Sequence, residues 1–113
     1  SLYIVKAIVL LDSAGNRVIS KYYDNTNELF SSVKEQKTFE KNLFQKTSKA
    51  NGEIIMLDNL TIVYRNSVDL YFYVIGSTTA NELILVSVLN CLYESINLIL
   101  RRNLEKKHLL EYL

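Results

Sequence analysis

A single cysteine and a single histidine are the residues of this sequence best suited to nucleophilic catalysis. A cysteine nucleophile needs an exposed thiol with a base beside it, so catalysis would require Cys91 to be paired with His108. Cys91 lies within a long apolar run, where a thiol behaves as a small hydrophobic group, and His108 follows Lys107 on a predicted helix surface. We therefore expect a buried thiol, a solvated histidine and no catalytic residue.

The sequence contains no pattern for a metal ion or a nucleotide cofactor. One histidine and one cysteine are too few for a metal-ligand cluster. The glycines, Gly15, Gly52 and Gly76, are isolated, and none of them precedes the lysine and hydroxyl residue of a phosphate-binding loop. We expect no cofactor. The lone cysteine cannot form an internal disulfide, which is typical of a protein in a reducing, cytoplasmic compartment.

The basic residues do not predict a nucleic-acid-binding surface. The net charge is +1 with both signs interspersed, so overall charge would attract neither nucleic acid nor an acidic membrane. One basic cluster alternates with glutamates and is typical of a solvated helix face; it comprises Lys34, Lys37, Lys41, Lys46 and Lys49. A second cluster suits either a helix C-terminus or a partner contact; it comprises Arg101, Arg102, Lys106 and Lys107.

The elements that would position these residues are organised around an apolar strand followed by a long apolar helix. Residues 68–75 are β-branched and aromatic, which predicts a central strand. Apolar residues recur with helical spacing over residues 83–100 and occupy more than one stripe. Such a helix is covered on two sides, either by a partner protein or by a third layer of its own chain, and both explanations remain open. Asn90, Glu94 and Asn97 interrupt the apolar run, which argues against a membrane-spanning helix.

The remaining segments predict further strands and helices joined by short turns. Strands are expected at residues 3–11, 17–23, 54–57 and 60–64, a helix at 32–46, and a polar, mobile loop at 24–30. Arg101-Arg102-Asn103 is expected to end the long helix, with a short helix after it. Strands joined by tight turns are antiparallel neighbours, so we predict an α+β fold with a single domain over residues 1–113.

Several segments together resemble the zeta small chains of the coatomer family and, more distantly, the sigma small chains of the clathrin adaptors. Each segment is short, but they occur in the same order as in that family and span nearly the whole chain. They are Ser1 to Ala7, Lys21 to Asp24, Ser32 to Lys41, Val63 to Arg65, Asp69 to Gly76 and Val88 to Leu92. The resemblance implies a longin-like (profilin-like) fold, a five-stranded antiparallel sheet with helices on both faces.

The resemblance also implies a role and a set of partners. Members of this family are small, non-enzymatic subunits of the COPI coat. That coat acts in Golgi-to-endoplasmic-reticulum retrieval and in transport within the Golgi. In that family the trunk of the coatomer gamma subunit cradles the small chain within a heteroheptameric coat that an ARF-family GTPase recruits. The implied location is the cytoplasm and the cytoplasmic face of Golgi membranes and COPI-coated vesicles, with peripheral membrane association through the coat.

Two other functions remain open at this point. The chain could be an adaptor small chain that contributes to a site for dileucine sorting peptides, or a longin-like module that regulates a small GTPase. Family members usually continue past Leu113 with further helix, so we expect this chain to lack the C-terminal part of the family's usual length. A following helix would cover part of the apolar helix, which weakens the argument for a partner protein.

The predicted partner interface combines the central strand and the long helix. Alternation along the strand places Leu70 and Phe72 opposite Tyr71 and Tyr73. We predict that Leu70, Phe72, Leu89 and Leu92 contribute to the core, while tyrosines approach the large subunit. The residues predicted to line the interface are Tyr71, Tyr73, Val88, Leu92, Tyr93 and Ile96.

Overall fold

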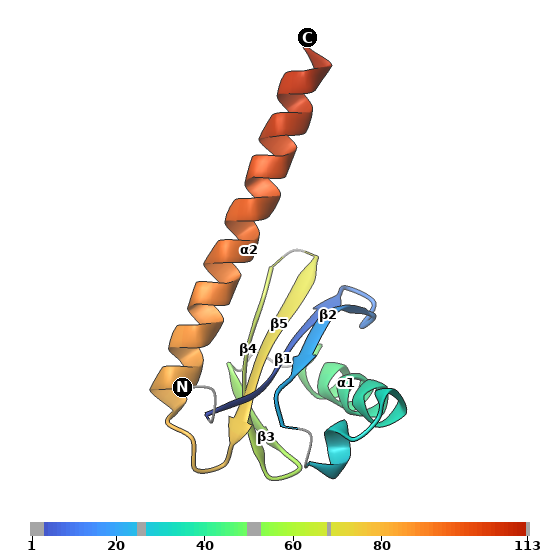
Figure 1. Cartoon of the computed structure of the whole chain (residues 1–113), viewed down its shortest axis with the longest axis vertical. Coiled ribbons are helices and arrows are strands. Elements are labelled where there is room, and N and C mark those ends of the chain that lie inside the picture. The colour runs from blue at the N-terminus through green and yellow to red at the C-terminus, as the bar shows by residue number, and fades with distance from the viewer. Residues whose placement is uncertain (1–3, 25–26, 50–52, 68, 113) are drawn as a thin grey trace.

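The structure is a computed structural model that describes residues 4–24, 27–49, 53–67 and 69–112 (Figure 1). Its strands are β1 Val5–Asp12, β2 Arg17–Tyr22, β3 Ile54–Leu57, β4 Leu60–Asn66 and β5 Leu70–Ser77. Its helices are the short 3-10 helix η1 Glu28–Phe30, α1 Val33–Thr47 and α2 Glu82–Glu111. Each strand predicted from the sequence is present, with small differences at the ends.

The strands form one antiparallel sheet in the order β2-β1-β5-β4-β3. The apolar strand β5 lies at the centre, between β1 and β4, as its composition predicts. Helix α1 covers one face of the sheet and α2 the other (Figure 1). The α+β class and the five-stranded antiparallel sheet with helices on both faces are therefore confirmed.

Each face of the sheet carries its own apolar core, because successive side chains of a strand point to opposite faces. On the α1 face, Phe39 and Leu43 of the helix pack with Val9, Ile62 and Ile75 of the sheet. The core on the α2 face comprises Val5, Leu10, Val63, Phe72, Val74, Leu85 and Leu89. Leu70 and Leu92 pack against this second core while remaining partly exposed.

The turn between β1 and β2 uses the polar residues and the glycine that the sequence provides. The Asp12 carboxylate accepts hydrogen bonds from the backbone N–H groups of Ala14 and Asn16, both at 2.9 Å. The bond from the Asn16 backbone holds the pKa of Asp12 below its usual value. Gly15 has a φ of 85°, and a Cβ at this position would lie 2.7 Å from the Phe44 ring. Glycine is thus required here by the backbone and by the close approach of α1.

Replacing Gly15 with alanine is expected to lower the free energy of unfolding by about 2 kcal/mol. A left-handed backbone costs a residue with a Cβ about 1–2 kcal/mol, and the displaced Phe44 ring adds to that cost. Urea unfolding followed by circular dichroism would measure the change, with Ala14→Gly as a control at an exposed turn position. A Gly15→Ala variant as stable as the parent would contradict this reading of the turn.

The segment before α1 corrects one prediction and agrees with the predicted start of the helix at residue 32. The Ser32 Oγ accepts a hydrogen bond from the Glu35 N–H at 3.2 Å, as expected of an N-cap. The polar loop expected at 24–30 instead includes η1, whose Phe30 is 2% exposed. The Phe30 ring lies 5.2 Å from the Phe39 ring in the core. A single aromatic residue in a polar segment has no periodicity, so the sequence pattern did not predict this contact; residues 25 and 26 lie outside the described residues.

Helix α2 is continuous over 30 residues, which corrects the predicted break at Arg101-Arg102-Asn103 and the separate short helix after it. Arginine is a good helix former, asparagine is tolerated, and no glycine or proline follows that would end the helix. The Asn81 Oδ1 accepts a hydrogen bond from the Leu83 N–H at 2.9 Å and caps the start. The distal half of α2 projects beyond the sheet, and the molecule measures 52 × 28 × 28 Å (Figure 1).

Tyr73 is the largest fully buried side chain of the central strand, and its environment predicts a loss of stability in alkali. Its hydroxyl lies 2.6 Å from the Thr47 hydroxyl, and burial raises the pKa of Tyr73 from its usual value of 10.0 to about 12. The folded state therefore holds the phenol proton more tightly than the unfolded state. The contribution of Tyr73 is complete below pH 10 and is lost as the pH rises towards 12, by about 2 kcal/mol.

Urea midpoints measured between pH 9 and pH 12 would test this expectation. Tyr73→Phe removes the ionisable group and should flatten the decline over that range, although the variant loses a hydrogen bond to Thr47 at pH 9. An unchanged slope in Tyr73→Phe would show that other groups govern the alkaline transition.

Candidate partner interface on helix α2

The first half of α2 lies across β4 and β5, whereas the second half is exposed to solvent. Leu85 is fully buried and Leu89 is 4% exposed, because both face the sheet. Tyr93 and Ile96 continue the same face and are partly buried. Every described residue from Leu98 onward is exposed. The helix is therefore a sheet-bound segment followed by a projecting arm, which we define as residues 98–112.

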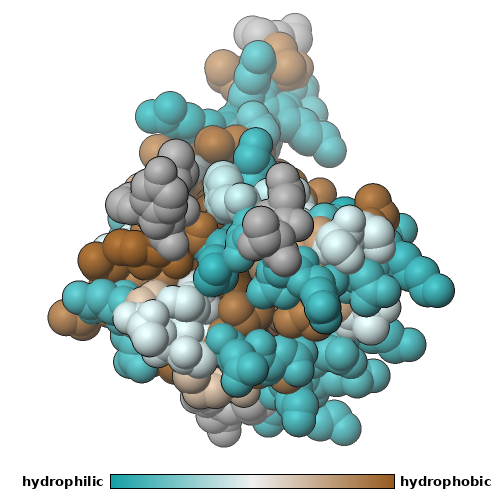
Figure 2. All heavy atoms as spheres, turned by 60° about the horizontal axis from the view of Figure 1, so that its bottom comes forward, coloured by the Kyte–Doolittle hydropathy of each residue, from teal (hydrophilic) through white to brown (hydrophobic). Residues whose placement is uncertain are grey.

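Many large apolar side chains of the projecting arm are exposed to solvent. Leu104 is 68% exposed and Tyr112 is 78% exposed. The other large apolar residues of the arm that are exposed are Leu98, Ile99, Leu100, Leu109 and Leu110. Apolar side chains at the far end of α2 are visible at the top of Figure 2. These exposed apolar side chains make the arm a candidate contact surface.

Helix α2 is also the one helix of the described part of the chain that is long and apolar enough to cross a membrane. Length and composition are weak criteria, because the core helices of soluble proteins also satisfy them. Leu85 and Leu89, in the first half of this helix, pack against the sheet. The apolar face is therefore at least partly a packing surface of the domain.

The residues predicted to line the interface do not form one surface. Tyr71 and Tyr73 lie on the α1 face of the sheet, where the Tyr71 ring is 5.2 Å from that of Phe44. Tyr73 has no exposed surface, so it belongs to the core and does not line a partner interface. The predicted residues that lie on α2 and remain partly exposed are Val88, Leu92, Tyr93 and Ile96.

Arg65 is a functional candidate that the sequence reasoning missed. It lies at the exposed end of β4, and its guanidinium carbon is 3.7 Å from the centre of the Tyr93 ring. The Arg65 Nη1 also donates a hydrogen bond to the Asn90 Oδ1 at 3.0 Å. These contacts join β4 to α2 across 25 and 28 positions of sequence, so no local pattern indicates them. The only sequence signal for a role of Arg65 is its position directly after the predicted apolar strand at residues 60–64.

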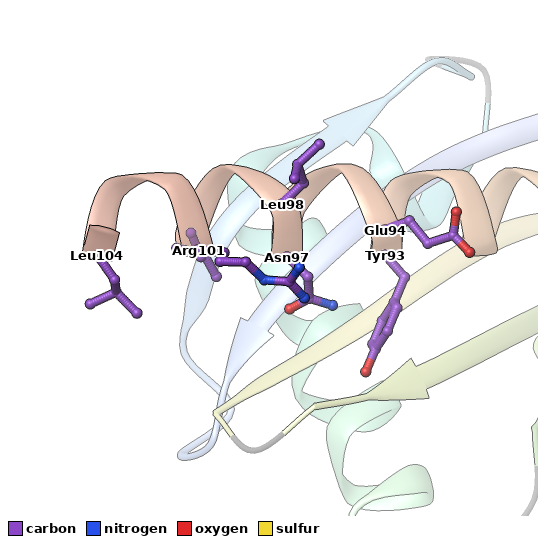
Figure 3. A pocket seen from close by; sticks show the side chains of 7 residues that line it. Tyr93, Glu94, Asn97, Leu98, Arg101 and Leu104 are labelled. Atoms are coloured by element: carbon purple, nitrogen blue, oxygen red, sulfur yellow. The ribbon is translucent and has the colours of Figure 1, made fainter. Parts of the chain in front are cut away.

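An open groove runs along α2 from Tyr93 into the projecting arm (Figure 3). In this view the Tyr93 ring points from the helix towards the β4–β5 hairpin, and Arg101 extends towards Asn97. Further lining residues are Glu94, Leu98, Leu100 and Leu104. The groove thus combines an aromatic ring, apolar side chains and a cation, which is a composition common at protein interfaces.

Glu40 is the most buried charged side chain described, at 3% exposed, and it forms a structural network. Its carboxylate accepts hydrogen bonds from the Arg17 Nε at 2.9 Å and Nη2 at 2.6 Å, and from the Ser20 Oγ at 3.0 Å and the Tyr22 Oη at 2.5 Å. Burial, followed by the adjacent carboxylate, raises the pKa of Tyr22 far above its usual range. Because Arg17, Ser20 and Tyr22 all belong to β2, we assign the Glu40 carboxylate to holding α1 against β2.

The two candidate catalytic residues are separated along one helix. Cys91 is exposed, which corrects the expected burial, because its position on α2 points away from the sheet. The His108 ring lies 4.9 Å from the Tyr112 ring on the projecting arm. Seventeen residues of helix separate Cys91 from His108, or about 25 Å, which prevents a nucleophile-base pair. No group of histidine, cysteine and acidic side chains able to hold a metal occurs among the described residues.

Comparison with known proteins places these features in a family. Residues 4–113 match the family model described as the clathrin adaptor complex small chain. The chain is 58% identical over 111 residues to coatomer subunit zeta-1 of Bos taurus and of Homo sapiens, covering 98% of this chain and 61% of each relative. It is 35% identical over 118 residues to coatomer subunit zeta of Saccharomyces cerevisiae, covering 98% of this chain and 62% of that relative. The chain therefore spans about three fifths of the length of these relatives.

Solved structures support the same fold at lower sequence identity. A chain in a structure described as a homology model of the full-length AP-3 complex in a stretched open conformation matches with a TM-score of 0.70 and 16% identity, covering 83% of this chain and 66% of that one. A Roadblock/LC7 domain from Streptomyces avermitilis matches with a TM-score of 0.55 and 12% identity, covering 87% of both chains. At these identities the likeness concerns the fold alone.

Proposed function

The chain belongs to the clathrin adaptor complex small chain family, and on this premise we propose that it is the small, non-catalytic subunit of a coatomer (COPI) vesicle coat. The observation that carries the proposal is the 58% identity to coatomer subunit zeta-1 across 98% of the chain. Proteins of this family are structural coat subunits. The separation of Cys91 from His108 is consistent with a non-enzymatic role.

The proposed partner is the trunk of the coatomer gamma subunit, within the heteroheptameric coat. The pair would act in Golgi-to-endoplasmic-reticulum retrieval and in transport within the Golgi. The chain would be cytoplasmic and would reach the cytoplasmic face of Golgi membranes and COPI-coated vesicles through the coat. The link to an ARF-family GTPase would be indirect, through the other coat subunits.

We place the partner contact on α2 and its projecting arm. Four residues lie beside the buried Leu85 and Leu89 of the helix and remain partly exposed: Val88, Leu92, Tyr93 and Ile96. The arm beyond Leu98 exposes apolar side chains that the domain does not cover. Burying this surface against a second protein would remove it from water, which is the main driving force of association.

Co-expression of the chain with the gamma-subunit trunk, followed by size-exclusion chromatography, tests the proposal. We expect the two proteins to co-elute as a one-to-one complex, and the chain alone to self-associate at high concentration through its exposed apolar arm. A chain that is a well-behaved monomer and elutes apart from the trunk would contradict the coat-subunit proposal. Binding of a dileucine peptide, or nucleotide-dependent binding of a small GTPase, would then be measured as the alternative functions.

A further inference from the structure

We propose that Arg65 is a pre-oriented anchor that binds a carboxylate of the large coat subunit. This inference rests on the proposed function, because it assigns a specific contact to the interface placed on α2. It concerns a residue of β4 that lies beside the helix rather than on it. The predicted partner chemistry is an acidic side chain next to an apolar surface.

Two contacts restrain the Arg65 guanidinium. Its carbon lies 3.7 Å from the Tyr93 ring centre, and its Nη1 donates to the Asn90 Oδ1 at 3.0 Å. A guanidinium that lies over an aromatic ring and also donates a hydrogen bond has lost much of its rotational freedom before any partner binds. Association then loses less side-chain entropy at this residue than at an unrestrained arginine, for which ordering costs about 0.5–1.5 kcal/mol.

Arg65 forms no ion pair within the described part of the chain. The ion pairs found there are Lys6 with Asp24 and Arg17 with Glu40, and neither includes Arg65. The Arg65 side chain is exposed, and its Nε and Nη2 donate no hydrogen bond to any described residue. The unused donors form the planar fork that matches a carboxylate in two parallel hydrogen bonds. Arginine and tyrosine are also the residues most enriched among interface residues with large binding energies.

The groove beside Tyr93 gives the partner a second contact. It passes Asn97 and Leu100 and reaches Leu104, which is 68% exposed. Eleven residues of helix separate Tyr93 from Leu104, or about 16 Å. The groove also holds Arg101, whereas Glu94 is its only carboxylate among the described lining residues. A complementary partner segment therefore presents an acidic side chain to Arg65 and an apolar side chain to Leu104, which lies about 16 Å from Tyr93 along the helix axis.

Affinity measurements with the gamma-subunit trunk test the proposal, using Arg65→Glu, Arg65→Ala and Arg65→Lys in the full chain. We expect binding to weaken about 30-fold in Arg65→Ala and more than 100-fold in Arg65→Glu, since a repelled carboxylate is worse than an unpaired one. Arg65→Lys keeps the charge but loses the planar fork and should weaken binding about tenfold. Raising the salt concentration should narrow the difference between parent and Arg65→Glu.

Lys34→Glu is the matched control, because Lys34 is an exposed cation on α1 and its substitution makes the same change in net charge. Helix α1 lies on the opposite face of the sheet from α2, so this substitution should change the affinity less than threefold. Thermal unfolding of each variant separates folding from binding. Arg65→Ala and Arg65→Glu should unfold at similar temperatures while their affinities differ.

The binding measurements give different results if the coat-subunit proposal is wrong and if only the Arg65 anchor is wrong. If the parent chain does not bind the trunk, the proposed function is wrong and the anchor with it. If the parent binds and Arg65→Glu binds equally well, or no worse than Lys34→Glu, only the anchor is wrong. Equal weakening in Arg65→Ala and Arg65→Glu, in proportion to a loss of folded protein, would mean that Arg65 acts only as a clamp between β4 and α2.

Discussion

Replacement of Glu40 by alanine is expected to lower the free energy of unfolding by about 3–5 kcal/mol, the cost of breaking a buried, hydrogen-bonded ion pair by removing one partner. Glu40 is 3% exposed and joins α1 to β2 through Arg17, Ser20 and Tyr22. Without the carboxylate, the Arg17 guanidinium loses its ion-pair partner, and the Tyr22 hydroxyl loses the buried oxygen that accepts its hydrogen bond. The loss includes these penalties as well as the bonds themselves.

Glu40→Gln and an exposed glutamate provide the controls for this prediction. Glutamine keeps the shape of the side chain but not its charge, so Glu40→Gln should lose about half as much as Glu40→Ala. Glu105→Ala, on the exposed arm, should stay within about 0.5 kcal/mol of the parent. Urea unfolding curves at pH 7 would give all of these values. A loss below about 1 kcal/mol in Glu40→Ala would mean that α1 and β2 are held together by apolar packing alone.

The fold was predictable because its strands are separated by turns with strong local preferences. Asp12 and Gly15 form the first turn through short-range hydrogen bonds and a positive φ, and both requirements are visible in sequence. Asp58 and Asn59 have φ values of 52° and 63°, and they form the two-residue turn between β3 and β4. The apolar composition of β5 predicted its central position.

The predictions that failed concern properties set by distant parts of the chain. Helix α2 continues through Arg101 because nothing in its own sequence ends it, and sequence alone could not show that the arm extends past the sheet. Tyrosines suit interfaces and core edges equally well, so composition could not assign Tyr73 to the core. Arg65 meets Tyr93 only through the packing of α2 across β4, which no local periodicity records.

Leu85→Ala is the prediction that tests the division of α2 most directly, and it should lower the free energy of unfolding by about 3–4 kcal/mol. Leu85 has no exposed surface, and its Cδ atoms would lie 2.9 and 3.0 Å from a Cβ on Gly76, which shows how closely the helix approaches β5. Truncation removes apolar contacts at this closest approach and leaves a cavity. Urea unfolding would measure the loss, and a change below about 1 kcal/mol would contradict the assigned packing.

Leu104→Ala is the matched substitution on the projecting arm, with the opposite expected result. Leu104 is 68% exposed, so its truncation should change the free energy of unfolding by less than about 0.5 kcal/mol. Binding to the gamma-subunit trunk should nevertheless weaken, about tenfold, if the arm is buried in the complex. Destabilisation by Leu104→Ala comparable to that of Leu85→Ala would show instead that the arm is packed within the domain. The pair of variants thus separates the helix segment that holds the fold from the segment proposed to hold the partner.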